Sequence, residues 1–281
     1  MDSLDHQILH YISESRNSVS FRRLHQRFKY VHQLEAKPLK QAVKRLVQEG
    51  RLCYRTDFGS TYLDIAMNGP VKISEHVFLK PPASRSIAGQ GEWEILLEKG
   101  AAFGRGDHPT TRLAIQLIDD LLHDTFWKEK KHSIMAIDIG TGSGVLAIVA
   151  AVIGVGRVKA VDIDPCAIFE ARANIQLNKM EKQVVLIDDL QQVDSGCCDL
   201  ILANLRTPTL MGFLPKILDL ASIDSTLIFS GMRTDETVFV CDRYRAAGFF
   251  QVKLCSEKDW SALILSRGDF LRDTGKRTLG Y

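Results

Sequence analysis

The stretch SIMAIDIGTGSGVLAIVAAVIGVGRVKAVDIDP, residues 133–165, decides the fold of this chain. An apolar run leads into Asp138 and a turn with a glycine at every second position, and a continuous apolar run then begins at Val145. A second apolar run ends at Asp162, about twenty residues after the glycines. This order predicts a strand, a glycine turn, a helix and a second strand that ends in an acid. It is the opening unit of a doubly wound α/β sheet.

The spacing of the glycines indicates the kind of ligand that the turn would hold. Glycines allow the backbone to approach a ligand closely, and a carboxylate at the end of the second strand can accept hydrogen bonds from both ribose hydroxyls. Gly140, Gly142 and Gly144 alternate, so they do not form the G-x-G-x-x-G pattern that binds a pyrophosphate. The pattern therefore favours a nucleoside cofactor without a pyrophosphate.

The later chain continues the alternation of strands and helices. QVVLIDDL (183–190), CDLILANL (198–205) and STLIFSG (225–231) are predicted as the third, fourth and fifth strands. A helix is expected over 236–249, and a terminal strand pair over 250–267. We therefore expect an α/β domain with a mostly parallel sheet.

The stretch AAFGRGDHPTTR, residues 101–112, opens a further helix and has two interpretations. Pro109 suits a first helical turn, and Asp107 or His108 can act as its cap. Alternatively, Gly104 and Gly106 let the backbone approach a ligand, while free N–H groups and the paired threonines offer hydrogen bonds. The sequence leaves both interpretations open.

The N-terminal part has a different pattern. Helical spacing of apolar residues predicts helices over 4–13, 20–28 and 35–50, and two β-rich runs over 51–66 predict a hairpin. Three helices and a hairpin resemble a winged-helix domain. The basic face of the third helix, Lys40, Lys44 and Arg45, fits binding to DNA or RNA, whereas such heads also serve dimerisation or protein docking. We divide the chain into this head (1–68), a linker rich in Pro and Gly (69–92) and the α/β domain (93–281).

Composition narrows the class of protein. The 281 residues are 45% hydrophobic and 25% charged, with a net charge of +2, so overall charge does not indicate nucleic-acid binding. Residues 1–70 nevertheless carry 11 Lys and Arg against 7 Asp and Glu. Neither a membrane-spanning run nor a secretory signal is seen, so a cytoplasmic protein without a membrane partner is expected. The six cysteines lack C-x-x-C spacing and are predicted as buried, reduced thiols, with no metal site.

The alternating glycines after D-x-G resemble motif I of S-adenosylmethionine-dependent methyltransferases. Together with AFGRGDHPTT, AVDIDP and ANL, residues 94–267 resemble the PrmA family, methyltransferases that modify amino groups of a ribosomal large-subunit protein. The resemblance implies a seven-stranded Rossmann-like sheet with an antiparallel last strand, and S-adenosylmethionine as cofactor. It also implies that the stretch before the first helix of this domain folds over the cofactor as a wall or substrate gate.

The resemblance also implies the site residues. The glycine turn would cradle the amino-acid end of the cofactor, Asp162 would hold the ribose, and Asp188 or Asp189 would meet the adenine amino group. Asp138 would support the turn or meet the cofactor ammonium group. The complete set of expected cofactor contacts is Phe103, Gly104, Thr110, Thr111, Asp138, Gly140, Thr141, Gly142, Gly144, Asp162, Ile163, Asp189 and Asn204.

Asn204 is the candidate catalytic residue, because its side-chain oxygen can accept amine hydrogens and orient the nucleophile; a role in the turn after the strand is the alternative. His108 is either a base or a packed ring, and Trp260 is either core or pocket wall. Two features depart from the family: Arg105 stands where threonine is usual, and the head does not resemble the family's docking domain.

These observations give one leading hypothesis and two alternatives. The leading hypothesis is methyl transfer from S-adenosylmethionine to a protein lysine or another protein amine. A small-molecule methyltransferase with a dimerising head is one alternative. A DNA-binding regulator that senses the cofactor is the other.

Overall fold

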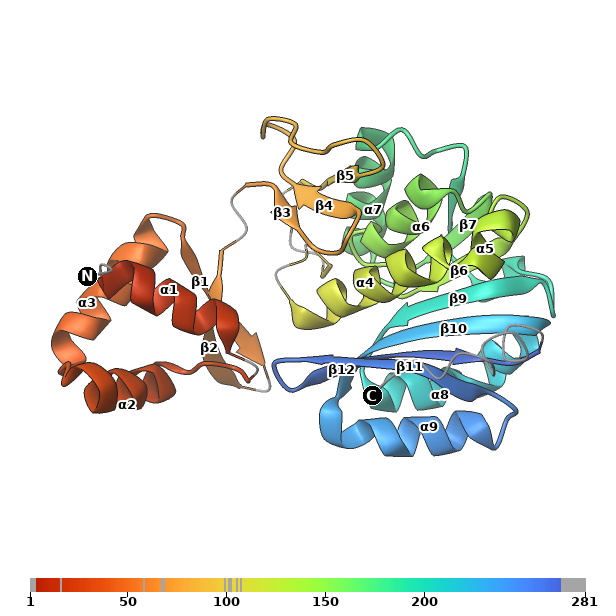
Figure 1. Ribbon diagram of the computed structural model, residues 1–281. Coiled ribbons are helices and arrows are strands. Elements are labelled where there is room, and N and C mark those ends of the chain that lie inside the picture. Colours follow the sequence, from red (N-terminus) through yellow and green to blue (C-terminus); the bar gives the residue numbers. More distant parts are fainter. Residues whose placement is uncertain are drawn as a thin grey trace. The chain divides into compact units, whose positions relative to one another are not determined.

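The computed structural model describes residues 4–15, 17–57, 59–66, 69–98, 100, 103–104, 106 and 108–268. They form two compact units (Figure 1). Unit 1 comprises residues 1–69 with 257–259, and unit 2 comprises residues 70–256 with 260–281.

Unit 1 contains the helices and the hairpin that the sequence predicts. Its elements are α1 (Leu4–Glu14), α2 (Phe21–His32), α3 (Ala36–Gln48), β1 (Leu52–Asp57) and β2 (Ser60–Ile65). The hydroxyl of Ser20 accepts a hydrogen bond from the Arg23 N–H and caps α2, and Gly50 follows α3 with a φ of +68°. Apolar faces of the three helices and the hairpin meet in one core, which includes Ile8, Ile12, Leu24, Phe28, Leu39 and Leu46.

Unit 2 is built on a seven-stranded sheet in the order β11-β12-β10-β9-β6-β7-β8. The strands are β6 (Met135–Ile139), β7 (Arg157–Val161), β8 (Val184–Ile187), β9 (Cys198–Asn204), β10 (Ala221–Arg233), β11 (Phe250–Glu257) and β12 (Trp260–Ser266). β6 lies in parallel between β7 and β9, and β12 runs antiparallel to β10. The predicted α/β class and the antiparallel last strand are confirmed.

Helices cover both faces of this sheet (Figure 1). Unit 2 contains α4 (Pro109–His123), α5 (Thr125–Lys130), α6 (Val145–Ile153), α7 (Pro165–Leu177), α8 (Thr207–Leu220), α9 (Thr237–Arg245) and the short 3-10 turns η1 (Leu190–Gln192) and η2 (Thr234–Glu236). α8 and α9 pack with alternate residues of β6, β9 and β10 in one core, while α4 and α6 lie on the other side of the sheet. None of the helices described here is long and apolar enough to cross a membrane.

The segment expected as a linker contains regular structure. β3 (Val71–Lys72) and β4 (Val77–Lys80) lie within it, and they form a three-stranded sheet with β5 (Trp93–Leu96). β4 pairs antiparallel with β3, across the connection 73–76, and in parallel with β5 on its other side. Residues 70–92 accordingly belong to unit 2.

The cysteines differ partly from the expectation. All six are free thiols, and Cys198 and Cys241 are buried as predicted. Cys166 is exposed, because it lies in the first turn of α7, and the other three are partly buried. The prediction that all six are buried was therefore wrong.

Candidate active site

The glycine turn after β6 lies against the stretch that precedes α4. Gly140, Gly142 and Gly144 all have positive φ values, which glycine adopts without strain. A Cβ atom on Gly142 would lie 2.5 Å from the carbonyl oxygen of Phe103, and the N–H of Ser143 donates to that same oxygen at 2.9 Å. The turn is therefore packed too closely for any other residue at position 142.

The stretch before α4 caps that helix and packs against the glycine turn. His108 is the helix cap, since its Nδ1 accepts a hydrogen bond from the Thr110 N–H at 3.3 Å. Gly104 has a φ of +108°, and its carbonyl accepts a hydrogen bond from the Ser143 hydroxyl at 3.1 Å. The stretch thus caps α4 and also forms a wall of the glycine turn. Arg105 and Asp107 lie outside the described residues.

Thr110 and Thr111 are both buried at the start of α4. The Thr110 hydroxyl lies 2.8 Å from His108 Nδ1, and the Thr110 carbonyl accepts a hydrogen bond from Ser230 at 2.9 Å. The Thr111 hydroxyl accepts a long hydrogen bond, 3.5 Å, from the Asn204 amide. These contacts join the start of α4 to the ends of β9 and β10.

Asp138 is buried at the end of β6 and only one of its carboxylate oxygens is hydrogen bonded. Oδ2 accepts from the Thr141 hydroxyl at 2.6 Å and from the Ala147 N–H at 3.2 Å. Oδ1 has no partner among the described residues. Burial raises the pKa of Asp138 to about 7, while the two hydrogen bonds act in the opposite direction.

Asp162 and Ile163 follow β7 and present different groups to the site. The Asp162 carboxylate accepts from the Gly142 N–H at 2.8 Å and from the Asp164 N–H at 3.0 Å, so it holds both the turn and its own loop. Each oxygen retains a further lone pair. The Ile163 side chain is 92% exposed, which leaves an apolar surface beside the carboxylate.

Asp188 and Asp189 follow β8 and are exposed. Asp189 accepts a hydrogen bond from the Gln191 N–H at 2.8 Å and caps η1, and Asp188 accepts one from Gln192 at 2.5 Å. Both carboxylates therefore have a local hydrogen-bond partner, in addition to the contact with the adenine amino group that is expected of one of them.

Asn204 is the last residue of β9. Only one end of its side-chain amide is held by a hydrogen bond. The amide nitrogen reaches Thr111, whereas the buried Oδ1 has no hydrogen-bond partner among the described residues. A buried polar atom without a partner costs free energy, so such an atom is a site for a ligand donor.

Sequence reasoning missed Ser230 and Gly231, which lie inside β10 where its pairing with β12 is irregular. A Cβ atom on Gly231 would lie 2.4 Å from the Leu205 carbonyl oxygen, and the Leu205 N–H donates to the Ser230 carbonyl at 3.1 Å. A glycine within a strand is the signal that indicated this close approach.

His108 and Trp260 pack against each other. Their ring centroids are 4.9 Å apart, and the Phe103 ring lies 5.1 Å from His108 on the described wall. Both His108 and Trp260 are buried, which favours packing roles for both.

The strand order, the glycine turn after the first strand and the acid after the second define the Rossmann-like fold of the class I S-adenosylmethionine-dependent methyltransferases. Residues 63–268 match the model of the family described as ribosomal protein L11 methyltransferase (PrmA). The chain belongs to this family.

Individual relatives agree with the family match. A ribosomal protein L11 methyltransferase of Geotalea uraniireducens is 32% identical over 198 residues, 69% of this chain and 63% of that protein. One from Exiguobacterium sibiricum is 37% identical over 199 residues, 70% of this chain and 61% of that protein. The crystal structure of a ribosomal protein L11 methylase from Lactobacillus delbrueckii subsp. bulgaricus has a TM-score of 0.63 and 27% identity, covering 72% of this chain and all of that chain.

The matches to the two curated relatives leave part of each protein uncovered. The chain spans somewhat over 60% of the length of these two curated relatives. The family match begins at residue 63, so nearly all of the three-helix head lies outside it.

Proposed function

We propose that this chain transfers a methyl group from S-adenosylmethionine to an amino group of a protein, with a lysine side chain as the leading candidate. The observation that carries this proposal is the buried Oδ1 of Asn204, which has no hydrogen-bond partner within the described part of the chain. An amide oxygen in this position can accept a hydrogen bond from an N–H of an incoming amine. This bond turns the nitrogen lone pair of the amine away from the strand end.

The residues around the turn fit the proposed cofactor. Gly142 brings the glycine turn close to the Phe103 backbone, which leaves main chain to line the cofactor site. Asp138 Oδ1, which is bonded to none of the residues that the structure describes, is a partner for the cofactor's ammonium group. Asp162 has the lone pairs that two ribose hydroxyls need, and exposed Ile163 offers an apolar surface for the base. When bound, S-adenosylmethionine supplies a methyl group on a positively charged sulfur, which makes the methyl carbon an electrophile.

The chain's own contribution is alignment. The amine must arrive neutral and attack in line with the carbon–sulfur bond, and the site must exclude water from the path of attack. We infer that Asn204 Oδ1 orients the amine, while Thr111 holds the Asn204 amide from the other side. With the cofactor bound, the amine nitrogen would gain the methyl group while the sulfur keeps the electron pair of the broken carbon–sulfur bond, and the resulting ammonium would release its extra proton to water.

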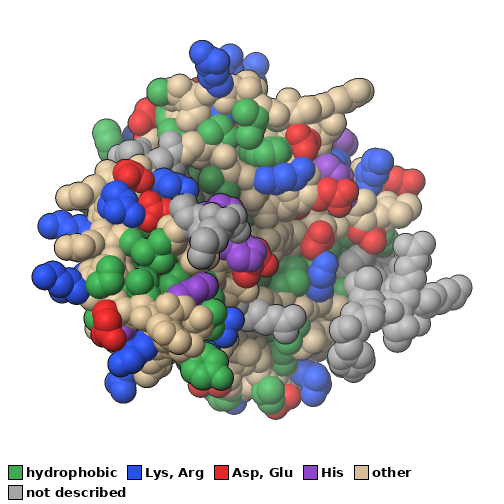
Figure 2. Space-filling model, turned by 60° about the vertical axis from the view of Figure 1, so that its left-hand side comes forward, with side chains coloured by type: hydrophobic (Ala, Val, Ile, Leu, Met, Phe, Trp, Pro, Cys, Tyr) green, Lys and Arg blue, Asp and Glu red, His purple; other side chains and the backbone are tan. Residues whose placement is uncertain are grey.

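The substrate is proposed from the relatives and from the head. The relatives are named for ribosomal protein L11, so L11 is the first substrate to test. The head lies outside the family match, and docking parts select macromolecular substrates. On the face in Figure 2, Lys and Arg side chains are scattered, with Asp and Glu between them, which favours protein docking over nucleic-acid binding by that face.

The test uses the purified full chain, methyl-labelled S-adenosylmethionine, isolated L11 and a fractionated lysate. We compare the wild type with Asp162→Ala, Asn204→Ala and the exposed-surface control Asp194→Ala. We expect label in a protein band. Asp162→Ala should weaken cofactor binding at least tenfold. Asn204→Ala should lower cofactor affinity much less than Asp162→Ala does, while kcat falls about 100-fold, the scale of one lost transition-state contact.

The other outcomes separate the alternatives. Label confined to small molecules would support a small-molecule methyltransferase. Cofactor binding without any transfer, together with salt-dependent binding to duplex DNA, would support the sensing regulator. An Asn204→Ala variant with wild-type turnover would remove the proposed role of Asn204.

A further inference from the structure

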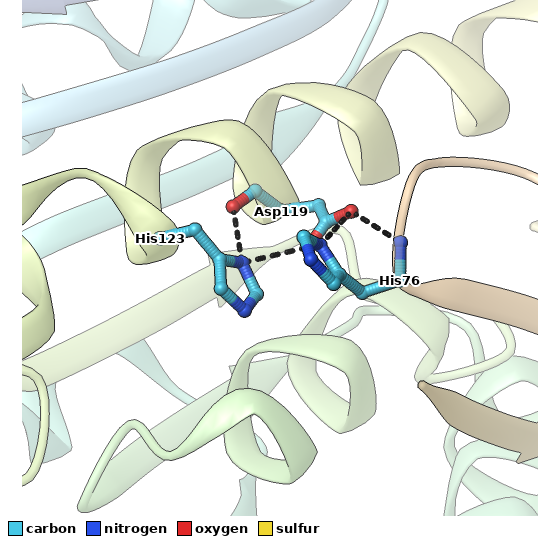
Figure 3. Close-up of side chains that lie close together, drawn as sticks. All are labelled: His76, Asp119 and His123. Atoms are coloured by element: carbon cyan, nitrogen blue, oxygen red, sulfur yellow. Dashed lines mark hydrogen bonds and ion pairs between the residues drawn. The ribbon is translucent and has the colours of Figure 1, made fainter. Parts of the chain in front are cut away.

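Unit 2 carries a second cluster of reactive side chains, formed by His76, Asp119 and His123 (Figure 3). Asp119 and His123 are four residues apart on α4, so they lie on the same face of the helix. His76 immediately precedes β4 and reaches the cluster from the three-stranded sheet. One ligand atom from each residue lies within 4.8 Å of the other two.

From this geometry we propose that His76, Asp119 and His123 bind one divalent transition metal ion of the zinc type. Two imidazole nitrogens and one carboxylate oxygen are a donor set that zinc prefers. Asp119 Oδ1 lies 3.1 Å from His76 Nδ1 and 2.9 Å from His123 Nδ1. Ligand atoms around a tetrahedral zinc ion are about 3.3 Å apart, so these atoms need to separate by only a few tenths of an ångström.

The surroundings support an ion at this position. The Asp119 side chain is 1% exposed. The backbone N–H of His76 donates a hydrogen bond to Asp119 Oδ2 at 3.0 Å, which fixes the carboxylate. The cluster borders a surface hollow of about 290 Å³ that the acids Glu75, Asp120 and Asp124 also line. Lys253, another lining residue, is paired with Asp120 at 2.7 Å, so its charge is largely compensated. The hollow gives water access to the remaining coordination positions.

The same contacts also describe a metal-free cluster in which both imidazoles donate to Asp119. His123 Nδ1 has the Asp119 carbonyl oxygen as a further acceptor at 2.8 Å, and the two rings stack with centroids 4.0 Å apart. A metal ion lies in the plane of each imidazole ring that binds it. Because the two rings are stacked, at least one of them must turn before both can bind the same ion. The His side chains are 27% and 25% exposed toward solvent, which leaves room for this turn.

The proposed ion is structural and separate from methyl transfer. Asp119 lies eight residues beyond Thr111 on α4, about 12 Å along the helix axis. The ion would join α4 to the segment before β4 across 43 residues of sequence. Because the folded state alone presents all three ligands together, metal binding would stabilise it.

The test measures metal binding rather than activity. The full chain is dialysed against a chelator and titrated with Zn²⁺, using a chromophoric competitor, and with Co²⁺, using its visible spectrum. His76→Ala and His123→Ala are compared with His132→Ala, which removes an exposed imidazole of unit 2. Far-ultraviolet circular dichroism checks that each variant is folded.

We expect one zinc ion per chain, a tetrahedral Co²⁺ spectrum without thiolate charge transfer, and a Tm about 5–10 °C higher at a free zinc concentration 100 times Kd. His76→Ala and His123→Ala should each weaken binding at least tenfold, and His132→Ala should not. Absent binding, binding unchanged in both variants, or a thiolate spectrum would overturn the proposal and leave a hydrogen-bonded His–Asp–His cluster.

Discussion

At the scale of single residues, Asp138 is a carboxyl group whose charge responds to ordinary changes of pH. Burial raises its pKa to about 7 from the ordinary value of 3.8. The folded chain therefore binds a proton that the unfolded chain releases between about pH 4 and pH 7. For this group, stability falls as pH rises through that window and levels off above pH 7.

The same residue gives a pH-dependent prediction for cofactor binding. If the ionised Asp138 meets the cofactor ammonium group, affinity should rise by up to tenfold per pH unit below pH 7 and then level off. Asp138→Asn keeps the size and an acceptor for Thr141 but cannot ionise, so its affinity should be low and independent of pH in this window. Cofactor titrations from pH 5.5 to 8.5 test this. Equal affinity and equal pH dependence in both proteins would leave Asp138 only its role in the turn.

At the scale of elements, the junction of β6 and α6 depends on one close backbone contact. Gly142→Ala would place a Cβ atom 2.5 Å from the Phe103 carbonyl oxygen at a φ of +55°. The added methyl must push the wall before α4 away from the turn, so cofactor affinity should fall more than tenfold.

Gly196→Ala is the matched control for this prediction. Gly196 also has a positive φ, +70°, but nothing lies within 4 Å of its added Cβ. The control should cost only the backbone strain, about 1 kcal/mol, and leave cofactor affinity unchanged. Isothermal calorimetry and denaturant unfolding measure the two effects, and equal losses of affinity in both variants would contradict the packing account.

Elements with strong local signals were predicted from the sequence, whereas very short strands and contacts between distant side chains were not. The β6–α6–β7 unit was predicted because its apolar runs, glycines and terminal acid are consecutive. β3 and β4 were missed because they are only two and four residues long and lie in a segment rich in Pro and Gly. The site contact of Asn204 with Thr111 was missed because the two residues are 93 positions apart. His76 and Asp119 likewise become neighbours only through the fold.

At the scale of the whole molecule, the chain combines a Rossmann-like methyltransferase fold with a head that lies almost entirely outside the family match. Unit 2 holds every proposed cofactor contact, and unit 1 has its own apolar core. Chemistry and substrate selection are therefore expected to respond to different substitutions.

Asp64 tests this separation, because it is the centre of a buried charge cluster of unit 1. Its carboxylate pairs with Arg55 at 3.2 Å and with Lys258 at 2.5 Å, and all three side chains are less than a tenth exposed. Asp64→Ala would leave two cations buried without their acid, which typically costs about 3–5 kcal/mol. Exposed Glu14→Ala should change stability by less than about 0.5 kcal/mol.

Denaturant unfolding and cofactor titration of the same Asp64→Ala samples measure the two units separately. Unfolding of unit 1 should occur at lower denaturant, while cofactor affinity stays within twofold of the wild type because no cofactor contact lies in that unit. Methyl transfer to a protein should fall through a higher KM for that protein, with kcat retained at saturation. A parallel loss of cofactor affinity would show instead that the charge cluster supports the catalytic fold itself.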